Sequence, residues 1–147
     1  MTKILFVCHG NICRSPMAES VMTYLVKERR LTDIVVDSAA TSTEEIGNGV
    51  HPGTQRVLRA HGIPVVPHRA RLLTRQDGEE FDLLVGMDAA NLRSMARMVD
   101  SGEKVHGLLD WSSLPRDIAD PWYTRDFETT FTDVLEGCTS LLEALTQ

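Results

Sequence analysis

The sequence predicts an α/β domain built on a parallel β-sheet. Apolar runs typical of buried strands, such as 4–7 and 83–87, alternate along the chain with segments of helical periodicity. The first run is followed at once by a glycine-containing loop and then by a helix. Because parallel sheets bind ligands outside the carboxyl ends of their strands, this loop is the first place to look for a site.

The elements of the first half follow from local patterns. Residues 4–7 form a continuous apolar run, as expected of a strand buried on both faces. Apolar residues recur at helical spacing from Ser15 to about Arg30, with Pro16 in the first turn, where proline is tolerated. A second strand is expected at 34–36, and residues 40–53, rich in Thr, Ser, Gly and Asn, are expected to form a loop.

The second half continues the alternation. A short helix is expected at 51–60, and a third strand at 83–87 precedes a helix that Asp88 caps and that runs to about 99. Residues 104–109 predict a short fourth strand, 110–123 a loop, and 126–145 the last helix. No repeat or linker interrupts the chain, so we expect one domain covering 1–147.

Composition excludes several classes of protein. The net charge of −6 argues against a nucleic acid partner. No apolar run approaches the roughly 20 residues that span a bilayer, so no membrane partner is expected. Three sparse cysteines form neither a disulfide framework nor a zinc cluster. We therefore expect a cytoplasmic protein that needs no metal or other cofactor.

The loop after the first strand has the composition of an anion site. Backbone N–H groups of a tight loop and a helix N-terminus together attract a phosphate group. Arg14 can grip two phosphate oxygens with its planar fork, and the same field favours the thiolate form of Cys8. A thiolate at the floor of such a loop is placed to attack phosphorus, and Ser15 can donate a hydrogen bond to it.

A phosphatase of this kind also needs an acid to protonate the leaving oxygen. Asp120 is the best candidate, because Pro121 stiffens the turn beside it, and Asp117 is the next choice. Trp122 and Tyr123 can form an aromatic wall for a ring-bearing substrate. Taken alone, an Asp-Pro pair is more often an ordinary turn.

Two segments together resemble a known family. The stretch 7–19, VCHGNICRSPMAE, is similar to the signature of the low-molecular-weight protein tyrosine phosphatases, and 120–123, DPWY, is similar to their acid loop. Segments 37–39, 61–63, 68–71 and 87–92 also stand where similar segments occur in that family. The resemblance implies a three-layer sandwich, in which a four-stranded parallel sheet of order 2-1-3-4 carries helices on both faces.

The resemblance also implies metal-independent hydrolysis of phosphotyrosine in proteins through a cysteinyl-phosphate intermediate, with inorganic phosphate as product. It assigns Cys8 as nucleophile, Arg14 as phosphate clamp and Asp120 as acid and base. It further implies that Asn11 holds the loop through hydrogen bonds with Ser38 and His68. The rest of the expected phosphate-binding loop consists of His9, Gly10, Ile12, Cys13 and Ser15.

The three cysteines have different expected roles. The resemblance implies that Cys13 lies near Cys8 and can form a reversible disulfide with it, which makes the protein redox-sensitive. A buried apolar role for Cys13 is an equal alternative on the sequence alone. Cys138 is expected to pack in the core beneath the last helix.

Relatives with other activities share the first loop. Thioredoxin-coupled arsenate reductases need two further cysteines in the middle of the chain, which are missing here. Bacterial protein-arginine phosphatases carry Thr where this chain has Ile12, and an apolar Ile suits a flat phenol. A non-catalytic phosphate-binding domain is the remaining alternative, but the expected nucleophile, clamp and acid are all present.

One position departs from the family pattern. Many members have a Trp as one wall of the pocket, and Glu44 stands at or near that place. A carboxylate there can disfavour acidic peptides, whereas a solvated rim glutamate is the plainer interpretation. We expect a monomer that acts on phosphotyrosine-containing proteins.

Overall fold

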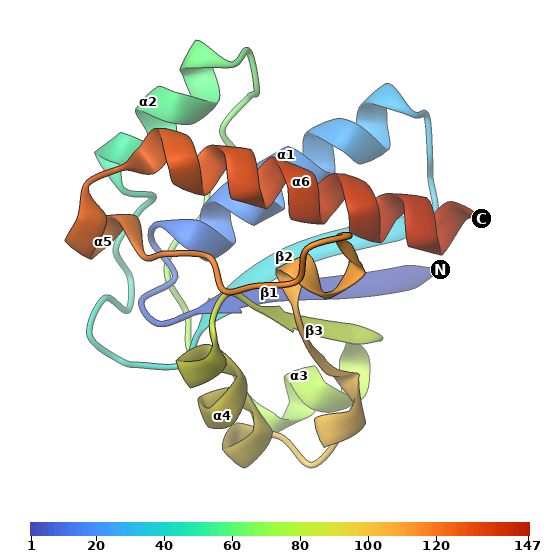
Figure 1. The fold of residues 1–147 in the computed structure, drawn as a ribbon. Coiled ribbons are helices and arrows are strands. Elements are labelled where there is room, and N and C mark those ends of the chain that lie inside the picture. The colour runs from blue at the N-terminus through green and yellow to red at the C-terminus, as the bar shows by residue number, and fades with distance from the viewer.

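The computed structural model describes residues 1–147 and contains one sheet between two layers of helices (Figure 1). The strands are β1 (Thr2–Cys8), β2 (Ile34–Ala40), β3 (Leu83–Gly86) and β4 (Val105–Gly107). All neighbouring pairs are parallel and the order is β2-β1-β3-β4. The sequence-based prediction of a four-stranded parallel sheet in the order 2-1-3-4 is therefore confirmed.

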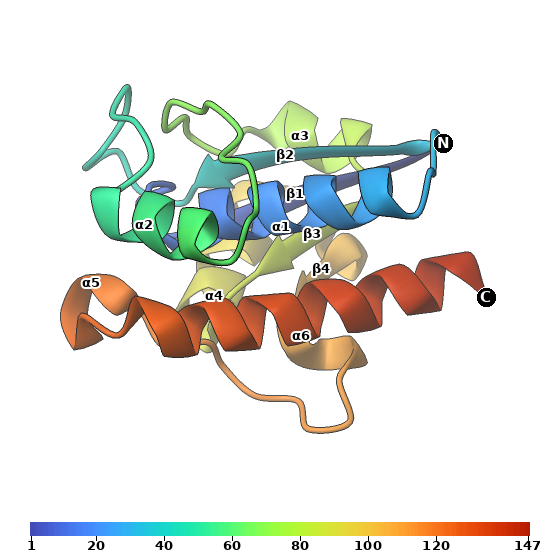
Figure 2. The ribbon, with the colours of Figure 1, turned by 90° about the horizontal axis from the view of Figure 1, so that it is seen from above.

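The chain forms six α-helices. They are α1 (Arg14–Glu28), α2 (Pro52–Ala60), α3 (Arg75–Glu80), α4 (Ala89–Met98), α5 (Pro121–Thr124) and α6 (Phe127–Thr146). Helices α1, α2 and α6 lie on one face of the sheet, and α3 and α4 lie on the other (Figures 1 and 2). Short 3₁₀ turns at Gly102–Lys104 and Leu108–Trp111 flank β4.

Strand β1 is the centre of both hydrophobic cores. Ile4, Phe6 and Cys8 belong to the larger cluster, under α1 and α6, whereas Leu5 and Val7 belong to the cluster under α3 and α4. Alternate side chains of a strand point to opposite faces, so a strand covered on both sides must be apolar throughout. This explains the unbroken apolar run that the sequence shows at its start.

The structure extends or corrects several predicted elements. Helix α3 was not expected, because a helix of 6 residues is too short to show helical periodicity; a capping box between Thr74 and Asp77 begins it. The stretch 110–123 is not entirely a loop, since it contains the end of the second 3₁₀ turn and the start of α5. The fourth strand is shorter than predicted, with β4 covering only 105–107.

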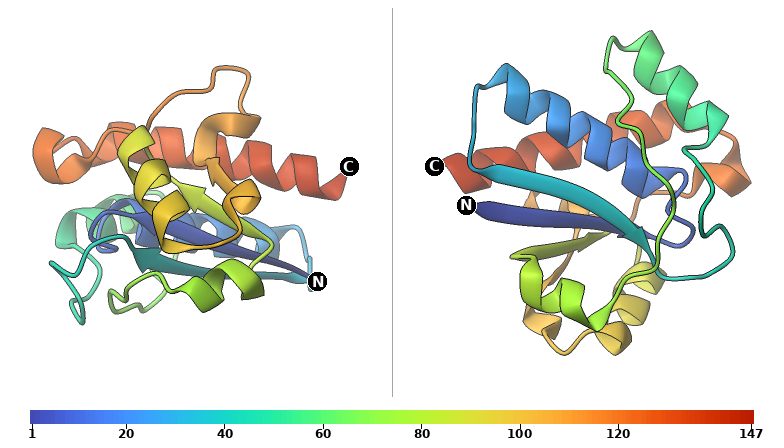
Figure 3. Two further views of the ribbon diagram at one scale, coloured as in Figure 1. Left: turned by 90° about the horizontal axis from the view of Figure 1, so that it is seen from below. Right: turned by 180° about the vertical axis from the view of Figure 1, so that it is seen from behind.

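The carboxyl ends of β1, β2 and β3 meet at the side of the molecule where α1 and α5 begin, and both chain termini lie at the opposite side (Figure 3). Loops from distant parts of the chain therefore converge beside Cys8. No helix has the length and apolarity needed to cross a membrane.

Candidate active site

Residues 9–13 connect β1 to α1. A pocket of about 90 Å³ lies beside this loop and is lined from it and its two ends by Cys8, His9, Gly10, Ile12, Cys13 and Arg14. Within this loop Asn11 adopts a left-handed conformation with φ of 59°, which is unusual for a residue other than glycine. Such a conformation persists only where the surroundings hold it, so the loop is shaped by contacts from the rest of the fold.

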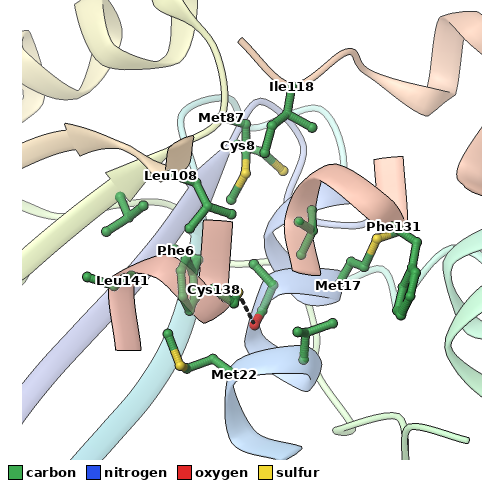
Figure 4. Close-up of a cluster of buried hydrophobic side chains, with 14 of the residues drawn as sticks. Phe6, Cys8, Met17, Met22, Met87, Leu108, Ile118, Phe131, Cys138 and Leu141 are labelled. Carbon is green, nitrogen blue, oxygen red and sulfur yellow. Dashed lines mark hydrogen bonds between the residues drawn. The ribbon is translucent and has the colours of Figure 1, made fainter. Parts of the chain in front are cut away.

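The Cys8 thiol lies at the inner end of the pocket, and only 3% of the residue is exposed. Its Sγ is 3.1 Å from the Ser15 hydroxyl and accepts a 3.4 Å hydrogen bond from the Ser15 backbone N–H. Cys8 also belongs to the larger core cluster, together with Met87 and Ile118 (Figure 4). The Ser15 hydroxyl and backbone N–H thus both lie within hydrogen-bond distance of the sulfur.

The Arg14 side chain is almost wholly buried, with 2% exposed. Its Nη1 donates to Asp88 Oδ2 at 2.7 Å and to the backbone carbonyl of Ile118 at 2.9 Å, and Nη2 donates to Asp120 Oδ2 at 3.3 Å. Its Nε is buried without a hydrogen-bond partner. Because an unsatisfied buried donor is costly, this N–H is available to an anion bound in the loop.

Asp120 lies at the start of α5 and lines the same pocket. Its Oδ1 accepts a 3.0 Å hydrogen bond from the Trp122 backbone N–H, which caps α5, and 23% of its side chain remains exposed. The alternative acid, Asp117, is exposed and does not line the pocket. The geometry therefore favours Asp120 over Asp117.

A network of buried polar side chains supports the loop from behind. Asn11 Nδ2 donates to the hydroxyls of Ser15 (2.8 Å) and Ser38 (3.0 Å), and His68 Nε2 lies 2.7 Å from Asn11 Oδ1. The three residues Asn11, Ser38 and His68 are thus brought together, as the resemblance implied. These bonds hold Asn11 in its left-handed conformation.

Glu19 completes this network and was missed by the sequence analysis. Its carboxylate accepts a 2.6 Å hydrogen bond from Ser38 and lies 3.4 Å from His68 Nδ1. Burial raises the pKa of Glu19 to about 7, and burial also lowers the pKa of His68. Both shifts favour the neutral forms of the Glu19 carboxyl and the His68 imidazole behind the loop.

Glu19, Asp37 and His68 are spaced closely enough to hold a metal ion. However, the guanidinium of Arg71 lies 3.3 Å from Asp37 and already supplies a positive charge there. A cation would be repelled by Arg71, so this cluster is better explained as support for the loop.

The walls of the pocket differ in character. Trp122 and Tyr123 line one side, with 49% and 79% of each residue exposed, and Ile12 lies inside. Glu44 and Glu45 line the rim, and Glu44 Oε2 is 3.1 Å from His9 Nε2. The pocket is therefore acidic on the side of Glu44 and Glu45.

The two remaining cysteines are both buried and free. Burial and the neighbouring Cys8 raise the pKa of the Cys13 thiol to about 12, so it stays protonated at neutral pH. Cys138 is fully buried in the larger core, where its Sγ lies 3.7 Å from the carbonyl of Ala18 (Figure 4). The predicted packing role of Cys138 is confirmed.

Asp88 is the most important residue that sequence reasoning did not assign to the site. Although burial opposes its ionisation, hydrogen bonds from Arg14 and from the start of α4 hold its pKa below the ordinary range. The sequence indicated Asp88 only as a helix cap. Its position at the carboxyl end of β3, next to β1, was the signal that could have placed it beside Cys8.

Comparisons with known proteins agree on the family. A family model described as "Low molecular weight phosphotyrosine protein phosphatase" matches residues 3–147. A low molecular weight protein-tyrosine-phosphatase, PtpA of Staphylococcus aureus, is 37% identical over 145 residues, covering 97% of this chain and 93% of the relative.

Solved structures show the same fold. YfkJ from Bacillus subtilis has a TM-score of 0.94 and 39% identity, over 99% of this chain and 94% of the other. A Drosophila arginine phosphatase, DARP, has a TM-score of 0.93 and 31% identity, over 99% of this chain and 99% of the other. Relatives with this fold therefore include one named an arginine phosphatase as well as those named protein tyrosine phosphatases.

Proposed function

Because this chain belongs to the low molecular weight phosphotyrosine protein phosphatase family and is a protein-tyrosine phosphatase, we propose that Cys8 is its nucleophile. The Cys8 thiolate attacks the phosphorus of phosphotyrosine, forming an S–P bond as the bond to the tyrosine oxygen breaks. The contacts from Ser15 to Cys8 Sγ support this assignment, since they favour the thiolate before attack and steady it as it leaves.

Arg14 is the phosphate clamp in this proposal. The observation that carries the assignment is that its buried guanidinium contacts Asp120, 106 residues away, while its Nε is left without a partner. A planar fork held by Asp88 and the Ile118 carbonyl is already oriented before phosphate arrives. Such preorganisation stabilises the equatorial oxygens in the transition state.

Asp120 is the acid and base. In the first step its carboxyl proton passes to the phenolate oxygen as tyrosine leaves. In the second step the carboxylate takes a proton from water, whose oxygen attacks the cysteinyl-phosphate and releases inorganic phosphate and the Cys8 thiolate. The hydrogen bonds among Asn11, Ser38 and His68 hold the loop open for both steps.

The pocket walls support a phenol as the leaving group. Ile12 gives the interior an apolar surface, and the exposed rings of Trp122 and Tyr123 can flank a tyrosine ring. The rim carboxylate of Glu44 favours basic residues next to the phosphotyrosine and disfavours acidic ones. We also propose that the chain works as a single-domain monomer in the cytoplasm.

Two variants test the assignment of the nucleophile and the acid. Cys8→Ser should abolish hydrolysis of p-nitrophenyl phosphate, and residual turnover would rule out Cys8 as nucleophile. Asp120→Ala should slow aryl phosphate turnover by about 10²–10⁴-fold, and a loss of less than about tenfold would mean that the acid lies elsewhere. A phosphotyrosine peptide should be a better substrate than a phosphoarginine protein, because Ile12 offers no hydroxyl to the polar guanidinium.

A further inference from the structure

His51 connects three parts of the molecule that meet beside the pocket. Its backbone N–H donates a 2.8 Å hydrogen bond to the carbonyl of Ile12 in the phosphate loop. Its side-chain Nδ1 accepts a 2.9 Å hydrogen bond from the Gly53 backbone N–H and so caps α2. The position of the imidazole ring is therefore fixed relative to the phosphate loop.

The same ring contacts the segment that carries Asp120. It stacks on Phe127 with ring centroids 5.1 Å apart and planes inclined by 23°. It also meets Trp122 in a T-shaped arrangement at 5.8 Å and 84°. Trp122 and Phe127 bracket residues 123–126, so one ring holds both ends of the turn that follows Asp120.

The close approach of α2 to Phe127 depends on a glycine. A Cβ atom at Gly53 would lie 2.5 Å from the Phe127 ring, too close for any side chain. Phe127 also packs against the small apolar cluster of Ile12, Cys13 and Ala70. The contact between α2 and the start of α6 is therefore part of the wall of the phosphate loop.

Asp120 depends directly on Trp122 for its orientation. Asp120 Oδ1 accepts the Trp122 backbone N–H at 3.0 Å, which leaves Oδ2 facing Arg14 at 3.3 Å. A shift of Trp122 would turn this carboxylate within the pocket. We propose that His51 is a positioning residue for the general acid, acting through Trp122 and Phe127; this inference rests on the proposed role of Asp120.

The surroundings of His51 favour the neutral form of its ring, as this role requires. Burial lowers its pKa, and so do the charges of Arg56 on α2 and Arg125 after α5, against the opposing effect of Glu45 in the rim loop. A proton on Nδ1 would remove the acceptor that caps α2. The neutral ring carries its hydrogen on Nε2.

Two substitutions of His51 distinguish the contribution of its aromatic ring from that of the Nδ1 acceptor that caps α2. Asn is a good N-cap, so His51→Asn keeps the start of α2 but removes both aromatic contacts. His51→Phe does the reverse, since it keeps a ring but loses the acceptor. The conservative ring variant should therefore rescue catalysis even where it lowers the melting temperature.

The measurement is kcat/KM for a series of aryl phosphates with leaving phenols of increasing basicity. A basic phenol needs a proton from Asp120, whereas an acidic one can leave as an anion. We expect His51→Asn to lower kcat/KM by about tenfold or more for the most basic phenols and by less than about threefold for p-nitrophenyl phosphate. His51→Phe should stay close to the wild type for both.

His61→Asn is the matched control. His61 follows α2, stacks on Phe131 of α6 with ring centroids 4.0 Å apart, and lies 2.5 Å from the Glu128 carboxylate. Its ring stacks on neither Trp122 nor Phe127, so it binds α6 without the contacts by which His51 would act. The His61→Asn variant should leave the dependence of kcat/KM on the basicity of the leaving phenol unchanged. If His51→Asn also leaves that dependence unchanged, or if His61→Asn alters it equally, the proposal is wrong.

The double variant with Asp120→Ala separates this inference from the proposed function. Because His51 acts through Asp120, His51→Asn should have almost no further effect once Asp120 is Ala. An equal loss in both backgrounds would overturn the positioning role alone. If Asp120→Ala by itself has little effect, the proposed acid is wrong and the role of His51 fails with it.

Discussion

The guanidinium of Arg14 and the carboxylate of Asp88 form a 2.7 Å ion pair across 74 residues of sequence. The pair joins the start of α1 to the start of α4, and it holds Nη1 of Arg14 while Asp120 contacts Nη2. A guanidinium buried without such a partner would be free to turn or would resist burial.

Replacement of Asp88 by Asn removes the charge that orients Arg14 while keeping an oxygen that can cap α4. Hydrogen bonds to charged groups contribute about 1.5–3 kcal/mol, so we expect kcat/KM to fall about ten- to hundredfold. Competitive inhibition by inorganic phosphate should weaken in parallel. Asn91→Ala disturbs the cap of α4 without touching Arg14, and should lower the melting temperature but leave phosphate inhibition within about threefold.

Substitution of Ser15 by Ala should slow the reaction at Cys8. The variant loses the hydroxyl 3.1 Å from Cys8 Sγ, and a hydrogen bond to a charged group contributes about 1.5–3 kcal/mol. We therefore expect kcat/KM for p-nitrophenyl phosphate to fall about ten- to hundredfold. Ser20→Ala removes a buried hydroxyl of the same helix that binds the Val66 backbone instead, and an equal loss there would contradict this explanation.

Peroxide should inactivate the enzyme by oxidising Cys8, and Cys13 should make this inactivation reversible. Peroxide oxidises the Cys8 thiolate to a sulfenic acid, and the Cys13 thiol then displaces water to form a disulfide that dithiothreitol reduces. Cys13→Ser should instead lose activity that dithiothreitol does not restore. Cys138→Ala should behave as the wild type, because Cys138 lies in the core. Full recovery of the Cys13→Ser variant would show that Cys13 does not protect Cys8.

Replacement of Glu19 by Gln should change the pH dependence of stability. Burial raises the pKa of Glu19 to about 7 from an ordinary value of 4.5. The folded protein therefore holds a proton that the unfolded chain releases, so the contribution of Glu19 to stability is present below about pH 4.5 and is lost as the pH rises through 7.

Urea unfolding at pH 5 and pH 8 measures this effect. Between these values the wild type should lose about 2–3 kcal/mol more unfolding free energy than Glu19→Gln. Glu143→Gln, at an exposed position of α6, should follow the wild type. Parallel profiles for the wild type and Glu19→Gln would mean that Glu19 is ionised at neutral pH.

Sequence reasoning found the parts of the site that are contiguous or carry a strong local pattern. Cys8, Arg14 and Ser15 belong to one strand–loop–helix segment, and Asp120 stands beside a proline and two aromatic residues. The buried strand before the loop was recognisable because β1 is covered on both faces and must be apolar throughout. Short elements such as α3 and α5 were not predicted, because they are too short for apolar residues to recur at helical spacing.

The sequence by itself therefore predicted the strands, the loop after β1 and the candidates for the reacting groups, because each is marked by residues that are neighbours in the chain. Only the tertiary structure decided that Asp88 holds Arg14, that Glu19 lies behind Asn11 and that His51 braces the segment of Asp120. These contacts join segments far apart in the chain, and they exist because the order of the parallel strands brings their carboxyl ends to one edge. No local pattern in the sequence encodes which side chains will face one another across that edge.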